Sequence, residues 1–195
     1  MPSVLITAFE PYEEWEENSS WLALIELTNW FDSGGRVTTR RYPANFDTVH
    51  KRLREDLRAE YDVMLHLGQL PGAPVLTLES VGLNLRNDGT ALFTGGPVAY
   101  QSALPLTRWE SKLREAGIPA KVSHHAGTYL CNATLFATHH LARELGVNTQ
   151  AAFIHVPLAP AQVAKAEKPL ASISTPLAAA GLAIILEDLL GAPKM

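Results

Sequence analysis

The chain has 195 residues, the length of a single domain. Hydrophobic residues make up 47% and charged residues 18%, a composition that excludes a disordered chain and favours a large apolar core. The net charge of −4 lacks the basic excess of a general nucleic-acid-binding protein. We therefore expect one folded domain over residues 1–195 that binds no nucleic acid.

The N-terminus and the cysteine content bear on where the protein works. The chain does not begin with the basic segment and apolar run of a secretory signal. Its longest apolar stretch, residues 175–186, is shorter than the roughly 20 residues that span a bilayer. The single cysteine, Cys131, cannot form an internal disulfide and fits a reducing compartment. We expect a cytoplasmic protein with no membrane partner.

Strand and helix patterns alternate along the chain. Short apolar runs predict strands over residues 4–6, 36–42, 62–67, 121–123 and 152–156, and a strand-like piece over residues 75–85. Helical spacing predicts helices over residues 105–116, 131–145 and 175–190, and two more that start near Trp21 and at the cap residue Asp47. This order predicts an α/β fold, a three-layer α/β/α sandwich around a mainly parallel sheet. Sites in such folds form at the carboxyl ends of the strands.

Cys131 lies where a nucleophile is favoured. It follows the turn at residues 126–128 and opens a predicted helix, whose positive end stabilises a thiolate over a thiol. The free backbone N–H groups at the same helix end can hold an oxyanion. The alternative is a small buried hydrophobic residue, the usual role of a lone cysteine. The two interpretations have about equal support from the residues alone.

His155 and Glu79 are candidate partners of this cysteine. His155 lies near the end of an apolar strand, and a cysteine nucleophile needs such a base. Glu79 is a single carboxylate in an apolar piece, and it can orient a histidine as the third member of a triad. The alternatives are a core histidine bonded to a carbonyl and a glutamate that faces water.

Other charged and metal-binding residue types have weaker patterns. The pairs His124-His125 and His139-His140 could join Cys131 in a metal site, but they lack a known ligand spacing, so histidines at the surface or pocket edge are favoured. The glutamates from Glu10 to Glu17 are typical of a solvated loop. The alternative is that their negative charge steers cationic peptides toward a nearby site. The sequence also lacks dinucleotide, P-loop and zinc-peptidase motifs.

Four parts of the chain form a recognisable set: a cysteine motif at residues 126–132, a histidine motif at 153–157, a glutamate motif at 68–69 and 76–81, and a first loop at 6–12 with Asn18 and Ser20. Together they resemble the motifs of the pyroglutamyl peptidase I family of cysteine peptidases. The resemblance covers nearly the whole chain, and its cysteine and histidine motifs together are fairly specific.

The resemblance implies an enzyme that removes the N-terminal pyroglutamyl residue from peptides, without a metal or organic cofactor. It implies Cys131 as nucleophile, His155 as base and then acid, and Glu79 as the residue that orients His155. The implied substrate-binding residues are Phe9, Tyr12, Asn18, Gln69, Tyr129 and Leu130. The resemblance also implies a homodimer or homotetramer.

The substrate chemistry fits these residues. Pyroglutamate is a lactam without an N-terminal ammonium, so its pocket needs apolar walls and a few hydrogen bonds rather than an acidic group. A site that bonds the lactam carbonyl should reject proline, which lacks it.

Several residues depart from the family pattern. The usual residues are glycine at Ala8 and Glu13, phenylalanine at Tyr12, proline at Ser19, arginine at Ser80 and small polar residues at His124 and His125. The segment after Asn84 is shorter than in the family, and Arg86 is a candidate replacement for an arginine that it normally carries. Two rival hypotheses follow: a non-catalytic pyroglutamyl-binding homologue, or another thiol-dependent hydrolase of amides or lactams.

Overall fold

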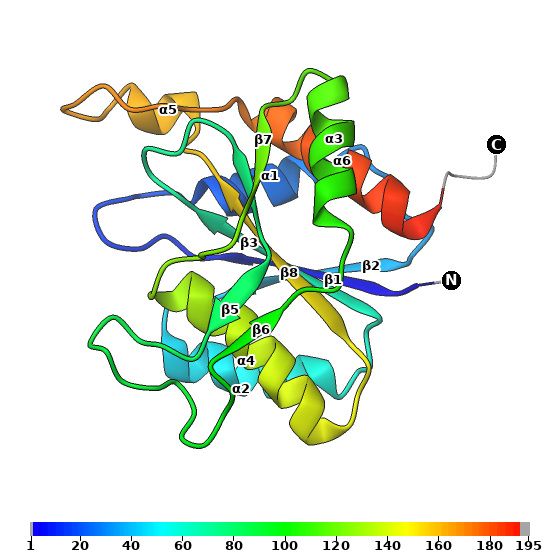
Figure 1. Cartoon of the computed structure of the whole chain (residues 1–195). Coiled ribbons are helices and arrows are strands. Elements are labelled where there is room, and N and C mark those ends of the chain that lie inside the picture. Colours follow the sequence, from blue (N-terminus) through cyan, green and yellow to red (C-terminus); the bar gives the residue numbers. More distant parts are fainter. Residues whose placement is uncertain (1, 192–195) are drawn as a thin grey trace.

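The computed structural model describes residues 2–191 of the chain. Its centre is a six-stranded sheet in the order β2-β1-β3-β8-β4-β7 (Figure 1). β4 pairs antiparallel with β8, and every other pairing in this sheet is parallel, which confirms the predicted mainly parallel α/β fold. The strands are β1 (Val4–Phe9), β2 (Val37–Tyr42), β3 (Val63–Gln69), β4 (Leu76–Glu79), β7 (Ala120–Ser123) and β8 (Gln150–Val156).

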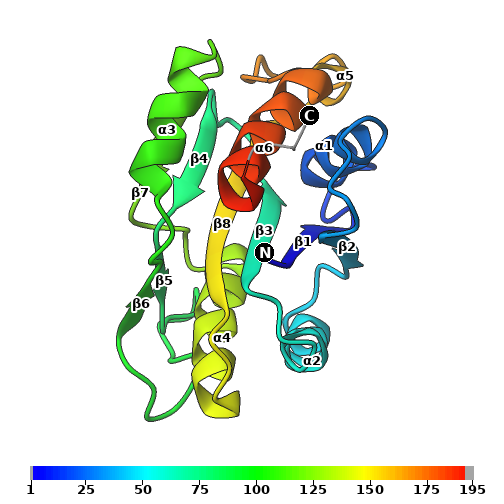
Figure 2. The same ribbon diagram turned by 90° about the vertical axis from the view of Figure 1, so that its right-hand side faces the viewer.

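Helices cover both faces of the sheet (Figures 1 and 2). One face carries α1 (Ser19–Thr28), α3 (Leu106–Glu115), α5 (Pro160–Val163) and α6 (Thr175–Leu190). The other carries α2 (Phe46–Leu57), α4 (Leu130–Leu145) and a hairpin of β5 (Val81–Leu83) and β6 (Ala99–Gln101). Among the described residues, no helix is long and apolar enough to cross a membrane.

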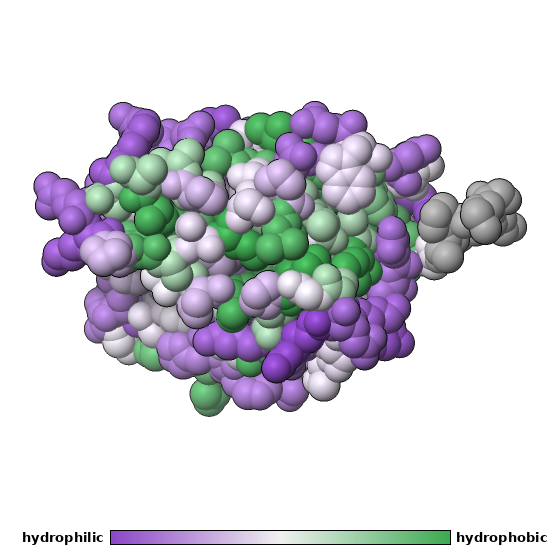
Figure 3. Space-filling model, turned by 90° about the horizontal axis from the view of Figure 1, so that it is seen from above, coloured by the Kyte–Doolittle hydropathy of each residue, from purple (hydrophilic) through white to green (hydrophobic). Residues whose placement is uncertain are grey.

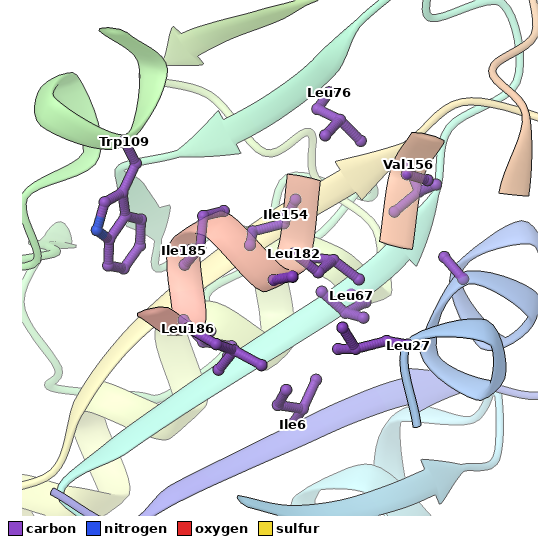
Figure 4. Close-up of a cluster of buried hydrophobic side chains, with 14 of the residues drawn as sticks. Ile6, Leu27, Leu67, Leu76, Trp109, Ile154, Val156, Leu182, Ile185 and Leu186 are labelled. Atoms are coloured by element: carbon purple, nitrogen blue, oxygen red, sulfur yellow. The ribbon is translucent and has the colours of Figure 1, made fainter. Parts of the chain in front are cut away.

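The side chains of each strand alternate between the two faces of the sheet, so the hydrophobic core consists of two clusters, one on each face. Successive side chains of a strand point to opposite sides of a sheet. In β1, Val4 and Ile6 therefore join the cluster under α1, α3 and α6, whereas Leu5 and Phe9 join the cluster under α2 and α4. Figure 4 shows the first cluster, in which α6 residues lie over Ile6 and neighbouring strand residues. Both faces of the sheet are buried, as the continuous apolar strands require.

The helix ends mostly follow the capping residues. Asn18 caps α1 by accepting the Ser20 N–H, and α4 ends at Gly146, which has a left-handed φ of 69°. The prediction for α2 was wrong by two residues. Asn45 is the cap, since its side chain accepts the Thr48 N–H, and Asp47 lies in the first turn.

Near the site, one prediction needs correction and one helix was missed. The single strand-like piece over residues 75–85 is two strands in different sheets. The chain changes sheet at Ser80, whose N–H donates to the carbonyl of Ser123, the last residue of β7, and whose carbonyl accepts from the N–H of Ser102, just after β6. The short helix α5, which Pro160 begins, was not predicted.

Candidate active site

All nine residues that the sequence predicted for the site line one cavity of about 1050 Å³. The strands β1, β3 and β8 end there, which is where parallel sheets place their sites. Tyr129 lies at the mouth, where 67% of its surface is exposed, whereas the partners Glu79 and His155 are buried. The nine are Phe9, Tyr12, Asn18, Gln69, Glu79, Tyr129, Leu130, Cys131 and His155.

Glu79 and His155 form a buried hydrogen-bonded pair. β4 runs antiparallel to β8 with Glu79 opposite Phe153, so Glu79 and His155 are diagonal neighbours on one face of the sheet. The Glu79 Oε1 atom lies 2.8 Å from His155 Nδ1. This contact leaves Nε2 as the imidazole atom available to the cysteine.

Cys131 interacts with His155 from the first turn of α4. Burial alone would lower the pKa of His155, but the charge and hydrogen bond of Cys131, together with the bond to Glu79, raise it to about 9. His155 is therefore held in its protonated, imidazolium form at neutral pH. Within residues 2–191, no side chain caps the N-terminus of α4, which leaves its first N–H groups available to bind an anion beside the sulfur.

Gly68 leaves space for the nucleophile. A Cβ atom on Gly68 would lie 2.6 Å from the Phe153 ring and 3.2 Å from Cys131 Sγ.

In the turn before α4, Gly127 has a φ of 81°, a backbone conformation that favours glycine. Its N–H donates to His125 Nδ1 at 3.0 Å, so His125 keeps its other nitrogen for the mouth of the cavity, which it lines.

The polar floor of the cavity is built around Gln69. Its side-chain oxygen accepts from the Ser19 backbone N–H and from Gln162 Nε2, each at 2.8 Å. Its amide nitrogen is buried and has no hydrogen-bond partner among the described residues. Asn18, by contrast, uses its oxygen for Ser20 and donates to the Glu10 carbonyl, so it mainly shapes the first loop.

Tyr12 gives the wall a hydroxyl group. Burial and the nearby charge of Cys131 raise the pKa of Tyr12 to about 12, so the hydroxyl stays neutral. It donates to the Gln69 carbonyl over a long 3.4 Å. The aromatic wall continues into the core, where Phe9 stacks with Phe153 at 6.2 Å between ring centroids.

Two departures from the family pattern contact each other. His124 Nδ1 lies 2.6 Å from Ser80 Oγ, which also donates to the Ser123 carbonyl. The pair ties the residue after Glu79 to the loop that leads to Cys131. These hydrogen bonds occupy the position that follows Glu79 in the chain.

The short segment after Asn84 lies outside the cavity. Asn84 bonds both the N–H and the carbonyl of Phe93, which closes the segment on itself. Arg86 lies over the Phe46 ring at 4.4 Å and does not line the cavity. Arg86 is therefore not a pocket residue in place of the missing arginine.

Some residues of the site were not predicted as such from the sequence. Gly68 lines the cavity, and Gln162 contacts the lining residue Gln69 from α5. His125 also lines the cavity, in agreement with the pocket-edge position favoured for its histidine pair. Gln162 has no neighbouring motif and stands in a helix that the sequence did not predict. Within residues 2–191, no three histidine, cysteine or acidic side chains come together as metal ligands would.

Comparison with known proteins shows the family of this chain. The sequence profile of the family described as pyroglutamyl peptidase matches residues 2–190. The chain belongs to this family. It is 37% identical over 178 residues to pyrrolidone-carboxylate peptidase 1 of Ralstonia nicotianae, covering 84% of this chain and 82% of that protein. It is 35% identical to the pyrrolidone-carboxylate peptidase of Thermococcus kodakarensis, covering 95% and 97%.

Solved structures of the family have the same fold. The pyrrolidone carboxyl peptidase of Fervidobacterium islandicum AW-1 superposes with a TM-score of 0.88 at 30% identity, covering 97% of this chain and 98% of that one. Pyroglutamyl peptidase I of Bacillus amyloliquefaciens superposes with a TM-score of 0.87 at 28% identity, covering 95% of each chain. The family, the fold and the class of enzyme, a hydrolase, are thus as the sequence predicted.

Proposed function

We propose how this chain, a pyroglutamyl peptidase by family, removes an N-terminal pyroglutamyl residue from peptides: Cys131 attacks, His155 transfers protons, and Glu79 holds His155. The observation that carries the proposal is the contact series Glu79–His155–Cys131, at the free N-terminus of α4 and inside one cavity. These positions match the roles that nucleophile, base and orienting carboxylate need.

The first half of the reaction forms an acyl-enzyme. The Cys131 thiolate attacks the carbonyl carbon that joins pyroglutamate to the next residue, and the oxygen becomes an oxyanion held by N–H groups at the start of α4. His155, already an imidazolium, then gives its Nε2 proton to the departing amine nitrogen. The C–N bond breaks, the shortened peptide leaves, and pyroglutamate remains as a thioester on the sulfur.

The second half regenerates the enzyme. Neutral His155 takes a proton from water, and the hydroxide attacks the thioester carbonyl. The C–S bond breaks, pyroglutamate leaves as a free acid, and the thiolate faces an imidazolium again. Glu79 keeps its bond to Nδ1 throughout, so that Nε2 always faces the sulfur.

Recognition of the ring uses the remaining predicted residues. Phe9 and Tyr12 supply apolar contact, and Gln69, which lines the same cavity, supplies polar groups for the lactam. Tyr129 and Leu130 close the side of the pocket next to Cys131. A polar group that loses the lactam carbonyl as its partner disfavours proline in the same position.

The test is release of a fluorescent amine from a pyroglutamyl amide, with the prolyl amide as control. We expect cleavage of the pyroglutamyl substrate alone, in reductant, with loss of activity after iodoacetamide. Cys131→Ser should remove turnover and leave the melting temperature nearly unchanged. Activity that survives this substitution excludes Cys131 as nucleophile. A folded, reduced protein that cleaves neither amide favours the binding-homologue hypothesis, whereas cleavage of other amides favours the second rival.

We further propose that the chain forms a homodimer or homotetramer through the face of α1 and α6. Figure 3 looks onto this face and shows hydrophobic residues gathered in its middle. Ile25 and Leu177 are 41% and 37% exposed there. Light scattering after gel filtration should show a dimer or tetramer for the wild type and a monomer for Ile25→Glu. Val98→Glu, on an exposed loop beside β6, is the matched control; an unchanged mass for Ile25→Glu excludes this face.

We also propose that the protein works in the cytoplasm. The mechanism needs a reduced Cys131, and a reducing compartment supplies that condition. Fractionation of cells that carry a tagged chain, with activity assayed in each fraction, tests this location.

A further inference from the structure

The loop that leads into α4 is held by a histidine side chain. His125 Nδ1 accepts the backbone N–H of Gly127 at 3.0 Å, two residues further along the chain. Gly127 has a left-handed φ of 81°, and the bond closes a tight turn around Ala126. Among the described residues, no other side chain bonds to the backbone of residues 126–129. The geometry of this turn therefore depends on His125.

The turn is followed directly by the groups that carry out the proposed reaction. Only residues 128 and 129 separate it from α4, whose first turn holds Cys131 and the N–H groups proposed to bind the oxyanion. Within residues 2–191 no side chain caps this helix, so its start lacks the local bond that usually fixes one. Asn132 holds the helix itself, and His125 supplies the nearest side-chain restraint on the loop that enters it.

The bond from Gly127 requires a neutral His125. A backbone N–H can donate only to a ring nitrogen that carries no proton, so Nδ1 is the acceptor and the proton of the neutral ring lies on Nε2. A second proton gives both ring nitrogens an N–H, and two donors then face each other in place of the bond. Histidine is the side chain that ordinarily gains its proton between pH 8 and 5, and His125 is exposed to the water that delivers it.

We propose that His125 is a positioning residue that makes the reaction sensitive to acid: the neutral ring holds the turn at residues 126–128, and with it the oxyanion-binding end of α4, whereas the protonated ring releases the turn. This inference rests on the proposed function of the same cavity. It gives the two histidines of the cavity opposite requirements, since His155 acts as an imidazolium and His125 must stay neutral.

Two substitutions separate the hydrogen bond from the proton. In asparagine, Oδ1 occupies the place of Nδ1, one bond beyond Cγ, so His125→Asn can still accept the Gly127 N–H but does not titrate. His125→Ala removes the acceptor at every pH. At pH 8, kcat for a pyroglutamyl amide should be near the wild-type value in His125→Asn and roughly 10-fold lower in His125→Ala. KM should change little, because an oxyanion forms only in the transition state.

A pH series from 8 to 5 distinguishes this role from a merely structural one. As the wild-type His125 gains its proton, kcat of the wild type should approach that of His125→Ala and fall roughly 10-fold below that of His125→Asn. The ratios of kcat isolate His125, because the other titratable groups around it are common to the three proteins. These groups are Glu10, Tyr12 and Glu13 of the first loop, Glu79 of β4, Cys131 of α4, His155 of β8, and His124 and Tyr129 beside His125 in its own loop.

A matched control and a spectroscopic measurement complete the experiment. His140→Asn makes the same change on α4 outside the cavity and should keep the wild-type kcat at every pH. Long-range ¹H–¹⁵N spectra should show the neutral His125 ring with its proton on Nε2, whether or not the protein is active.

Three results overturn the inference: a wild-type kcat in His125→Ala, a His125→Asn protein that loses activity in acid in parallel with the wild type, or a neutral His125 ring protonated at Nδ1. A wild type that cleaves no pyroglutamyl amide, although His125 carries its proton on Nε2, overturns the proposed function instead.

Discussion

At the scale of single residues, Gly68 shows how close the packing around the sulfur is. Gly68→Ala would place a methyl group 2.6 Å from Phe153 and 3.2 Å from Cys131 Sγ. The ring lies in the core and has little room, so the sulfur and the strand must move. Because a displacement of about 1 Å can cost roughly 10²-fold in rate, we expect kcat to fall by about that factor. Steady-state kinetics measures it; a wild-type kcat would show that the sulfur has more room than this geometry allows.

Glu79 permits a second test at the same scale. Its Oε1 atom holds His155 Nδ1 at 2.8 Å, and both side chains are buried. Glu79→Gln keeps the size of the side chain but removes the negative charge that favours the imidazolium. It also allows the amide nitrogen, instead of the oxygen, to face His155 Nδ1. We expect kcat to fall by roughly 10²-fold or more while KM changes little. An unchanged kcat would leave Glu79 with a structural role only.

At the scale of elements, Asn132 joins the nucleophile helix to the β5–β6 hairpin. Its oxygen accepts from the Leu83 N–H at 2.7 Å, and its nitrogen donates to the carbonyls of Leu83 and Leu85 at 2.9 and 3.0 Å. The adjacent Gly82 packs directly on the backbone of α4 at Phe136. The hairpin therefore supports the first turn of α4, in which Cys131 lies.

Asn132→Asp tests this link. A carboxylate can still accept from Leu83, but it cannot donate to either carbonyl, and it introduces a buried, unpaired charge. We expect a loss of about 3–5 kcal/mol in the free energy of unfolding, measured in urea. Asn87→Asp, the same change at an exposed position of the segment after Asn84, should cost less than about 0.5 kcal/mol. Equal losses in both variants would contradict the supporting role.

The elements also show what could be predicted from the sequence. The helix over 131–145 was predictable because Leu135, Leu141 and the terminal Gly146 are local signals. The change of sheet at Ser80 was not, because it depends on bonds to Ser123 and Ser102, far along the chain. Likewise the cysteine, histidine and glutamate stood in recognisable motifs, whereas Gln162 acts only through tertiary contacts that no local pattern encodes.

At the scale of the whole molecule, one sheet carries both hydrophobic clusters. The cluster under α2 and α4 and the cluster under α1, α3 and α6 share the same strands, so neither can be removed without exposing the other. This favours our proposal that the chain is a single domain, which should unfold cooperatively. Coincident urea transitions by circular dichroism and tryptophan fluorescence would support it, and separate transitions would contradict it.

His155 makes the stability of this domain sensitive to alkali. Its folded pKa of about 9 lies above the ordinary value of 6.5, so the folded state binds this proton more tightly than the unfolded state does. The resulting stability is fully present below pH 6.5 and is lost as the pH rises through 9. The free energy of unfolding should therefore decrease between pH 7 and 9. A flat profile over this range in urea titrations would show that the proton is not held.

Two other histidines lower the stability of the domain in acid, because their pKa values are lowered in the folded state rather than raised. Burial, and after it the charge of His139, lower the pKa of His66 to about 3, and burial lowers the pKa of His139 to about 4. His66 lies neutral between the hydroxyls of Thr7 and Thr138, at 2.7 and 2.9 Å. Below pH 6.5 the unfolded chain binds protons that the folded state refuses, so the free energy of unfolding falls as the pH decreases toward 4.

The contribution of His66 can be isolated by substitution. Each such histidine adds up to about 1.4 kcal/mol per pH unit to the slope of the free energy of unfolding below pH 6.5. His66→Gln retains a polar side chain for the two threonines but cannot titrate, so its urea stability should depend less steeply on pH between 6 and 4. His139→Gln should act in the same direction, and the double variant should show the shallowest slope. If His66→Gln retains the wild-type slope, the acid sensitivity arises elsewhere, in the carboxylates rather than in the buried histidines of the sheet and α4.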